Sequence, residues 1–156
     1  MKDKRFFAAA LAVVLLAALC SAFFVQLLLI HGDSMSPVYR SGSLVLLQKR
    51  PAAYSRGDVV LCRSETLGRS VVKRIAATEG DALAVEGDGL YINGVWAAAM
   101  PEESERAVLP AAVPPGQFLL LGDNRAESVD SRNAALGLVT QAQLRGRVIF
   151  PVRAGP

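Results

Sequence analysis

Ser34 and Lys73 are the two residues of this sequence whose chemistry could combine into a catalytic pair. Ser34 lies in the stretch Gly-Asp-Ser-Met-Ser-Pro at residues 32–37, in which the Gly-Asp pair and the proline favour a turn that exposes and fixes the hydroxyl. A serine hydroxyl is a weak nucleophile near neutral pH and needs a base that removes its proton. The identity of that base decides whether Ser34 can react.

The only histidine, His31, lies three residues before Ser34, a cramped place from which to reach the same hydroxyl. We interpret His31 as an interfacial residue. Lys73 is the alternative base, because alternation in the predicted strand puts it on the same side as Val71 and Ile75, facing the core. The sequence therefore predicts a serine nucleophile that is activated by a buried lysine.

A lysine acts as a base at neutral pH only if its pKa is lowered. The ordinary pKa is about 10.4, so a free amine at pH 7 requires a decrease of roughly 3 units, or about 4 to 5 kcal/mol. Burial against apolar groups lowers a lysine pKa by that much. No acid is an obvious neighbour, since Glu79 and Asp81 belong to a predicted turn. Alone, a serine in a turn and a lysine in a strand are usually structural, but their combination favours catalysis.

The N-terminus has the features of a membrane anchor. Residues 1–5 carry Lys2, Lys4 and Arg5, and residues 6–30 are almost all apolar. About 25 helical residues span roughly 37 Å, enough to cross a hydrocarbon core of about 30 Å. The basic flank predicts a cytoplasmic N-terminus at residues 1–5, a single transmembrane helix at 6–30 and an extracytoplasmic domain at 31–156.

Two processed N-termini are alternatives to a retained anchor. A cleaved secretory signal has an apolar region of about 7 to 15 residues, which is shorter than this run. A lipoprotein signal ending at Cys20 would have a small residue before the cysteine, where this chain has Leu19. We therefore expect a retained anchor in the cell membrane, in contact with lipid.

The rest of the chain predicts one mainly β domain, a compact and mostly antiparallel β-barrel or sandwich. Asn93-Gly94 is its strongest hairpin signal. Hairpins form a short β insert at about residues 82–116, and the proline-rich part of that insert, residues 97–116, is typical of a surface loop. The expected strands cover residues 44–47, 59–62, 70–76, 117–121 and 145–151, with a polar loop at 122–133.

Composition argues against several other classes of function. The formal net charge is +3, with no basic block that also carries aromatic residues, so nucleic acid is not expected as a partner. Cys20 lies in the apolar run and Cys62 far beyond it, so they are not expected to form a disulfide. With one histidine and no cysteine pair, neither a metal site nor a cofactor is expected. The sequence does not indicate an oligomeric state.

Several motifs occur in a fixed order after the N-terminal span. They are residues 32–37, Ser41–Leu46, Arg56–Val60, Val72–Ile75, Gly80-Asp81 and, most specific, Gly122-Asp123-Asn124-Arg125 followed by Ser128, Asp130, Ser131 and Arg132. In this order the chain resembles the bacterial type I signal peptidases, a family of membrane-anchored serine proteases with a Ser/Lys dyad. The resemblance is collinear from Lys2 to Pro151.

The resemblance implies a role for each of five site residues. Ser34 would be the nucleophile and Lys73 the general base. Ser128 would hydrogen-bond the lysine amine and orient it, while Asp130 and Arg132 would pair to hold the loop that carries Ser128.

The resemblance also implies how the substrate is held. Met35 would line the substrate site, and the backbone N–H of Ser34 would bind the oxyanion that forms on the scissile carbonyl. Gly32 stands where part of the family has a serine that completes the oxyanion hole. The large inserted β domain of longer family members is absent from this sequence.

The implied activity is the removal of signal peptides from secretory pre-proteins. The substrate would add as an extended strand beside the site, with small residues favoured at the first and third positions before the cut. Two alternatives stay open. One is a self-cleaving regulator with the same Ser/Lys chemistry, and the other is a membrane-anchored β module that binds partners without catalysis.

Overall fold

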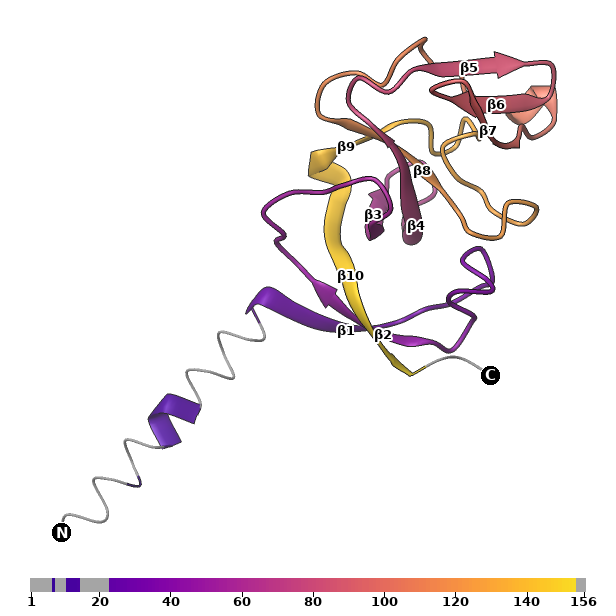
Figure 1. The fold of residues 1–156 in the computed structure, drawn as a ribbon. Helices are drawn as coiled ribbons and strands as arrows, with labels where there is room; N and C mark the ends of the chain where they lie inside the picture. The colour runs from indigo at the N-terminus through magenta and orange to yellow at the C-terminus, as the bar shows by residue number, and fades with distance from the viewer. Residues whose placement is uncertain (1–6, 8–10, 15–22, 154–156) are drawn as a thin grey trace.

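Two antiparallel β-sheets form the folded part of the protein, described here from a computed structural model for residues 7, 11–14 and 23–153 (Figure 1). The larger sheet has seven strands and the smaller has three. The elements are β1 (Val25–Leu29), β2 (Leu44–Gln48), β3 (Val59–Ser64), β4 (Arg69–Thr78), β5 (Leu83–Glu86), β6 (Gly89–Ile92), β7 (Val95–Ala99), the 3₁₀ helix η1 (Glu103–Glu105), β8 (Gln117–Leu121), β9 (Val139–Thr140), the 3₁₀ helix η2 (Gln141–Gln143) and β10 (Leu144–Arg153).

The apolar N-terminal run does not stay helical to residue 30, so the predicted end of the helix is wrong. Phe23 and Phe24 are helical, but the chain then extends into β1, which pairs antiparallel with β2. Pairing with a neighbouring strand satisfies the backbone groups of these residues outside a helix. Most of the predicted transmembrane segment lies outside the described residues, as does Cys20. Among the residues that are described, no helix is both long and apolar enough to cross a membrane.

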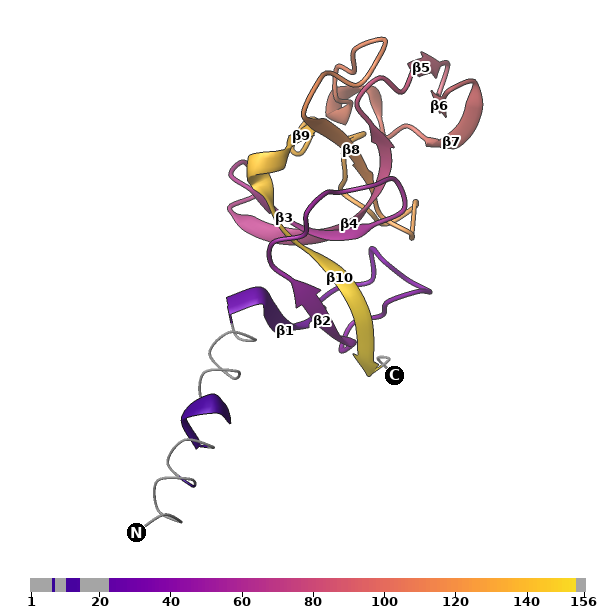
Figure 2. The same cartoon turned by 60° about the vertical axis from the view of Figure 1, so that its left-hand side comes forward.

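The larger sheet has the strand order β1-β2-β10-β3-β4-β8-β9. Each neighbouring pair is antiparallel, which confirms the prediction of a mainly β, antiparallel domain. The sheet ends at β1 and β9, so the described strands do not close into the predicted barrel. Four antiparallel steps separate β1 from β4, so these two strands run in the same direction. The sheet curls so strongly that β1 and β2 lie well below β4 and β8 (Figure 2).

The smaller sheet, β5-β6-β7, lies within residues 82–116. Its second turn is formed by Asn93 and Gly94, with φ angles of 51° and 77°, as the hairpin signal predicts. The prediction of a surface loop at residues 97–116 is wrong in part, because Met100 and Val113 are only 8% and 2% exposed. Both side chains join the core against β8 and the small sheet.

Strand β8 connects the two halves of the core. Leu119 and Leu121 pack into the cluster shared with the small sheet, and Phe118 and Leu120 pack into the cluster formed with β3 and β10. A strand that is buried on both faces cannot shift without opening a cavity. Strand β8 therefore holds the loop that begins at Gly122 in a fixed position.

Candidate active site

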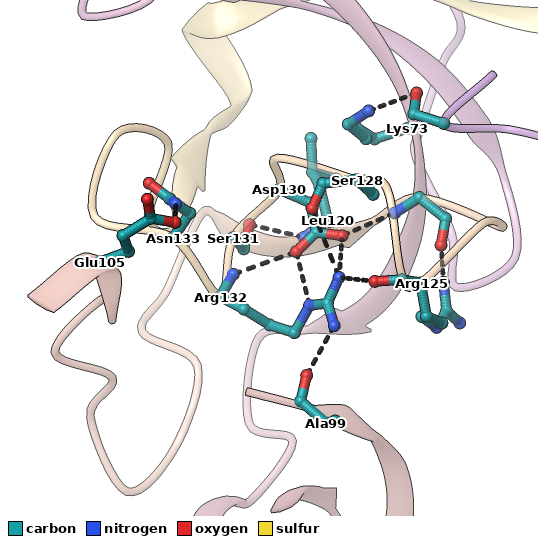
Figure 3. A network of polar contacts seen from close by, with 12 residues as sticks. Lys73, Ala99, Glu105, Leu120, Arg125, Ser128, Asp130, Ser131, Arg132 and Asn133 are labelled. Carbon is teal, nitrogen blue, oxygen red and sulfur yellow. Dashed lines mark hydrogen bonds and ion pairs between the residues drawn. The ribbon is translucent and has the colours of Figure 1, made fainter. Parts of the chain in front are cut away.

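The structure brings Ser34 and Lys73 together, although 39 residues separate them. The Nζ atom of Lys73 donates a hydrogen bond of 2.6 Å to the Oγ atom of Ser34 (Figure 3). This distance is short for an N–H···O bond. The two groups that the sequence suggests as nucleophile and base are therefore in position for direct proton transfer.

The loop that carries Ser34 is closed by backbone hydrogen bonds at its base. Ile30 N–H donates to the carbonyl of Ser43, and Gly42 N–H donates to the carbonyl of Ile30, both at 2.9 Å. Met35 anchors the loop from inside, since its side chain is 1% exposed. This closure leaves Ser34 half-buried at the edge of a cleft rather than on a free loop.

Strand β4 places Lys73 on the inner face, as alternation predicts. Lys73 lies opposite Val60 of β3, and both are buried, as is Ile75 two residues further along. Lys73 is 3% exposed, so its stem and amine have been taken out of water. A charged amine in such a place is unfavourable unless it is paired.

Burial lowers the pKa of Lys73 to about 8, below its ordinary value of 10.5. The Asp130 carboxylate raises this pKa, the Arg69 and Arg132 charges lower it, and Asp123 raises it. The expectation that no acid lies near Lys73 is therefore wrong, because the 122–133 loop brings in two carboxylates from far along the chain. Desolvation of the amine lowers the pKa by more than the two carboxylates raise it.

The 122–133 loop is held by a buried ion pair. The Nε of Arg132 is 2.9 Å from one oxygen of Asp130, and its Nη2 is 3.0 Å from the other. Asp130 also accepts the Gly122 N–H at 3.0 Å, and Arg132 donates to the carbonyls of Ala99 and Arg125 at 2.6 and 2.7 Å. These bonds tie the loop to β8 and to the end of β7 (Figure 3).

Ser128 has a different environment from the one that the resemblance implies. Its Oγ is buried and has no hydrogen-bond partner among the described residues, whereas Lys73 donates to Ser34 instead. The hydroxyl nevertheless lies against the site. A Cβ added at Gly122 would come within 2.1 Å of the Ser128 Oγ and 2.6 Å of the Ser34 carbonyl oxygen. Only a glycine at position 122 leaves room for both.

Two contacts of the site were not predicted from the sequence. The guanidinium of Arg74 binds Asp123 through two hydrogen bonds of 2.8 and 2.7 Å. The Asn124 N–H donates to the Ser34 carbonyl at 3.0 Å. Together they fasten the 122–133 loop to β4 and to the Ser34 loop. Asp123 and Asn124 belong to the Gly122-Asp123-Asn124-Arg125 motif, which is visible in the sequence but does not by itself indicate these contacts.

A cleft of about 550 Å³ opens beside Ser34 and Lys73. The end of β1 lines one wall and the start of β4 lines the other, with residues Leu28–Ile30 and Arg69–Lys73 among those that face it. Strand β8 pairs with β4 only from Arg74 onward, so within the described sheet the 69–73 segment keeps one unpaired edge. Met35 and the exposed His31 also line the cleft.

The Ser34 loop has one further polar contact that bears on the oxyanion. Gly32, at φ 83°, donates its N–H to the Ser41 hydroxyl at 3.2 Å. Glycine adopts this left-handed conformation without strain. Position 32 therefore contributes a backbone turn, and the site has no side-chain donor there.

Comparisons with known proteins identify relatives of this chain. The family described as "Signal peptidase, peptidase S26" matches residues 4–153. Signal peptidase I T of Bacillus subtilis (strain 168) is 33% identical over 88% of this chain and 80% of its own length, and signal peptidase I of Bacillus licheniformis is 32% identical over 88% and 83%. A solved signal peptidase I from Enterococcus faecalis V583 is 28% identical, covers 65% of this chain and 100% of its own, and superimposes with a TM-score of 0.47.

An antiparallel β domain with a serine beside a buried lysine is typical of a class of serine hydrolases. The chain belongs to the signal peptidase family, peptidase S26. It is accordingly a hydrolase, a serine endopeptidase.

Proposed function

We propose that this protein is a membrane-bound serine endopeptidase that removes signal peptides from secreted pre-proteins, with Ser34 as nucleophile and Lys73 as general base. The observation that carries the proposal is the 2.6 Å contact between the Ser34 hydroxyl and a lysine amine that is 3% exposed. A buried amine with a pKa of about 8 is neutral often enough near pH 7 to act as a base.

The chemistry follows from this contact. The lone pair of neutral Lys73 takes the proton of the Ser34 hydroxyl while the Oγ attacks the scissile carbonyl. The oxyanion of the tetrahedral intermediate accepts the Ser34 N–H, and loss of such a donor typically costs about 3 kcal/mol. As the peptide C–N bond breaks, the protonated lysine gives its proton to the leaving amine. A water molecule, deprotonated by Lys73, then releases the acyl chain from Ser34.

The 122–133 loop supports this reaction without touching the substrate bond. Asp130 and Arg132 hold the backbone of the loop, and the loop places the Ser128 hydroxyl beside the dyad. We propose that Ser128 finds its partner during the reaction, when the Lys73 amine turns away from Ser34 toward the leaving group. A buried hydroxyl without a partner carries a cost, which a hydrogen bond to the amine would offset.

The cleft provides a place for an extended substrate. Peptides often bind by adding a strand to a free sheet edge, where backbone bonds give affinity and alternate side chains give selection. Strand β1 is an edge strand of the sheet, and the 69–73 segment of β4 is free on the side away from β3. Both segments run in the same direction and end at the dyad. We propose that the chain before the cut lies between them, with Met35 against it.

The proposed location follows from the N-terminal sequence. We propose one membrane span within residues 6–30, shortened at its C-terminal end by β1, with residues 1–5 in the cytoplasm and the β domain, from β1 onward, outside. The cleft wall formed by β1 would then begin where the span ends. A signal segment that leaves the membrane would meet the dyad a few residues later, with lipid close by.

Cleavage of a pre-protein by the purified full chain in detergent tests the proposal. Ser34→Ala and Lys73→Ala should each reduce the rate at least about 1,000-fold, while Ser104→Ala, a change at an exposed serine of η1, should leave it unchanged. A folded Ser34→Ala protein with full activity would refute the dyad. Cleavage only of the chain itself would favour a self-cleaving regulator, and binding without cleavage would favour a non-catalytic module.

A further inference from the structure

Arg69 is a cation in the cleft that the proposed reaction does not use. It is exposed, it lines the cleft, and its side chain makes no hydrogen bond or ion pair within the described part of the chain. The other charged side chains at the cleft wall away from the dyad lysine are already engaged. Asp33 accepts the Ser41 N–H at 3.3 Å, and Glu127 accepts from the Asn124 amide at 3.3 Å.

The register of β4 places Arg69 on the same face as Lys73. The pairing of β3 with β4 is regular from Arg69 to Arg74, so side chains alternate without interruption over this segment. Arg69, Val71 and Lys73 therefore face one side in succession. The whole 69–73 segment lines the cleft. Four residues of extended chain put the α-carbon of Arg69 roughly 13 Å from that of Lys73.

From this position the positive charge of Arg69 lowers the pKa of Lys73. Burial is the main cause of the low pKa of Lys73, and Arg69 is the larger of the two arginine charges that lower it further. This effect agrees with the place of Arg69 in the wall of the same cleft as Lys73.

We propose that Arg69 is a specificity-determining residue that favours an acidic or other hydrogen-bond-accepting side chain near the fifth substrate position before the cut, and disfavours a basic one. The proposal rests on the proposed function, because it assumes that the chain before the cut lies along the free edge of β4. Strand β8 occupies that edge from Arg74 onward, so the bound segment extends from the dyad toward Arg69. If the first position faces Lys73, the third faces Val71 and the fifth faces Arg69.

The test measures kcat/KM of the full chain in non-ionic detergent on three matched substrates. They differ only at the fifth residue before the cut, which is Asp, Asn or Lys. An exposed ion pair changes binding by up to about 1 kcal/mol, so the wild type should cleave the Asp substrate about fivefold faster than the Lys substrate. Arg69→Glu should reverse the order, and Arg69→Gln should remove it. Salt at about 0.5 M should weaken the preference.

Arg63→Glu is the matched control. Arg63 is exposed on β3 and lies opposite Ser70, so it points to the face away from Arg69 and does not line the cleft. It should keep the wild-type preference. The ratio between substrates is the readout, because a charge change at Arg69 also alters Lys73 and with it the rate on every substrate.

The outcomes separate this proposal from the proposed function. Cleavage of all three substrates at one rate, or a preference that Arg69→Glu leaves unchanged, would overturn the role of Arg69 while the endopeptidase assignment stands. Failure of the wild type to cleave any of the substrates would instead contradict the proposed function itself.

Discussion

Replacing Lys73 by methionine should make the folded protein more stable at neutral pH. The folded pKa of Lys73 is about 8, against an ordinary value of 10.5, and a difference of roughly 2.5 pH units corresponds to about 3 kcal/mol. Methionine has a similar length and no charge, so it removes this cost. It also removes the hydrogen bond to Ser34, worth about 1 kcal/mol. The expected net gain at pH 7 is about 2 kcal/mol.

The gain should depend on pH in a defined direction. Below about pH 8 the lysine binds a proton in both states, so the wild type bears the full cost of the buried charge. Between about 8 and 10.5 the folded lysine is neutral while the unfolded one keeps its proton, and the stability of the wild type rises with pH. Above that range the cost is gone, and the variant should be less stable by about 1 kcal/mol.

Urea unfolding of both full chains in detergent, from about pH 6 to pH 11, measures this difference. Arg63→Met is the control, because Arg63 is exposed and lies on the face of the sheet away from Lys73, so its effect should not vary with pH. A Lys73→Met protein that is less stable than the wild type by the same amount at every pH would refute the claim that Lys73 is held at a low pKa by burial.

Three further substitutions test the loop that supports the dyad. Asp130→Asn leaves the Arg132 charge buried without its partner, so unfolding in urea should show a loss of about 3 to 5 kcal/mol; a loss below about 1 kcal/mol would contradict it. Gly122→Ala puts a Cβ 2.1 Å from the Ser128 Oγ and 2.6 Å from the Ser34 carbonyl, so kcat should fall about 100-fold, and activity within twofold of wild type would show that the loop yields. Ser128→Ala removes a buried hydroxyl that lacks a partner among the described residues, so stability should hold or rise by about 1 kcal/mol while kcat/KM falls; unchanged kcat/KM would exclude the proposed contact with the Lys73 amine.

Strand alternation was sufficient to place Lys73 in the core. The run from Ser70 to Ile75 is short, rich in β-branched residues and free of bulges up to Arg74. The alternation of side chains expected from the sequence is therefore the alternation that the sheet shows. The Asn93-Gly94 turn was equally predictable, since it requires only local backbone conformations.

The errors concern residues whose conformation depends on distant parts of the chain. Residues 25–29 are apolar enough to continue a helix, but pairing with β2 makes them a strand. The acids that act on Lys73, Asp123 and Asp130, lie about 50 residues further along the sequence, so no local pattern places them there. The ion pair of Arg74 could not be predicted from a local pattern either, because its partner Asp123 comes from the 122–133 loop.

The pH dependence of pre-protein cleavage tests the central claim most directly. If Lys73 is the base for Ser34, kcat/KM should rise about tenfold per pH unit below pH 8 and level off above it, since only the neutral amine accepts the serine proton. The residual activity of Lys73→Ala should lack this step. A wild-type profile that is flat from about pH 6 to pH 10, or a step that survives in Lys73→Ala, would contradict the account.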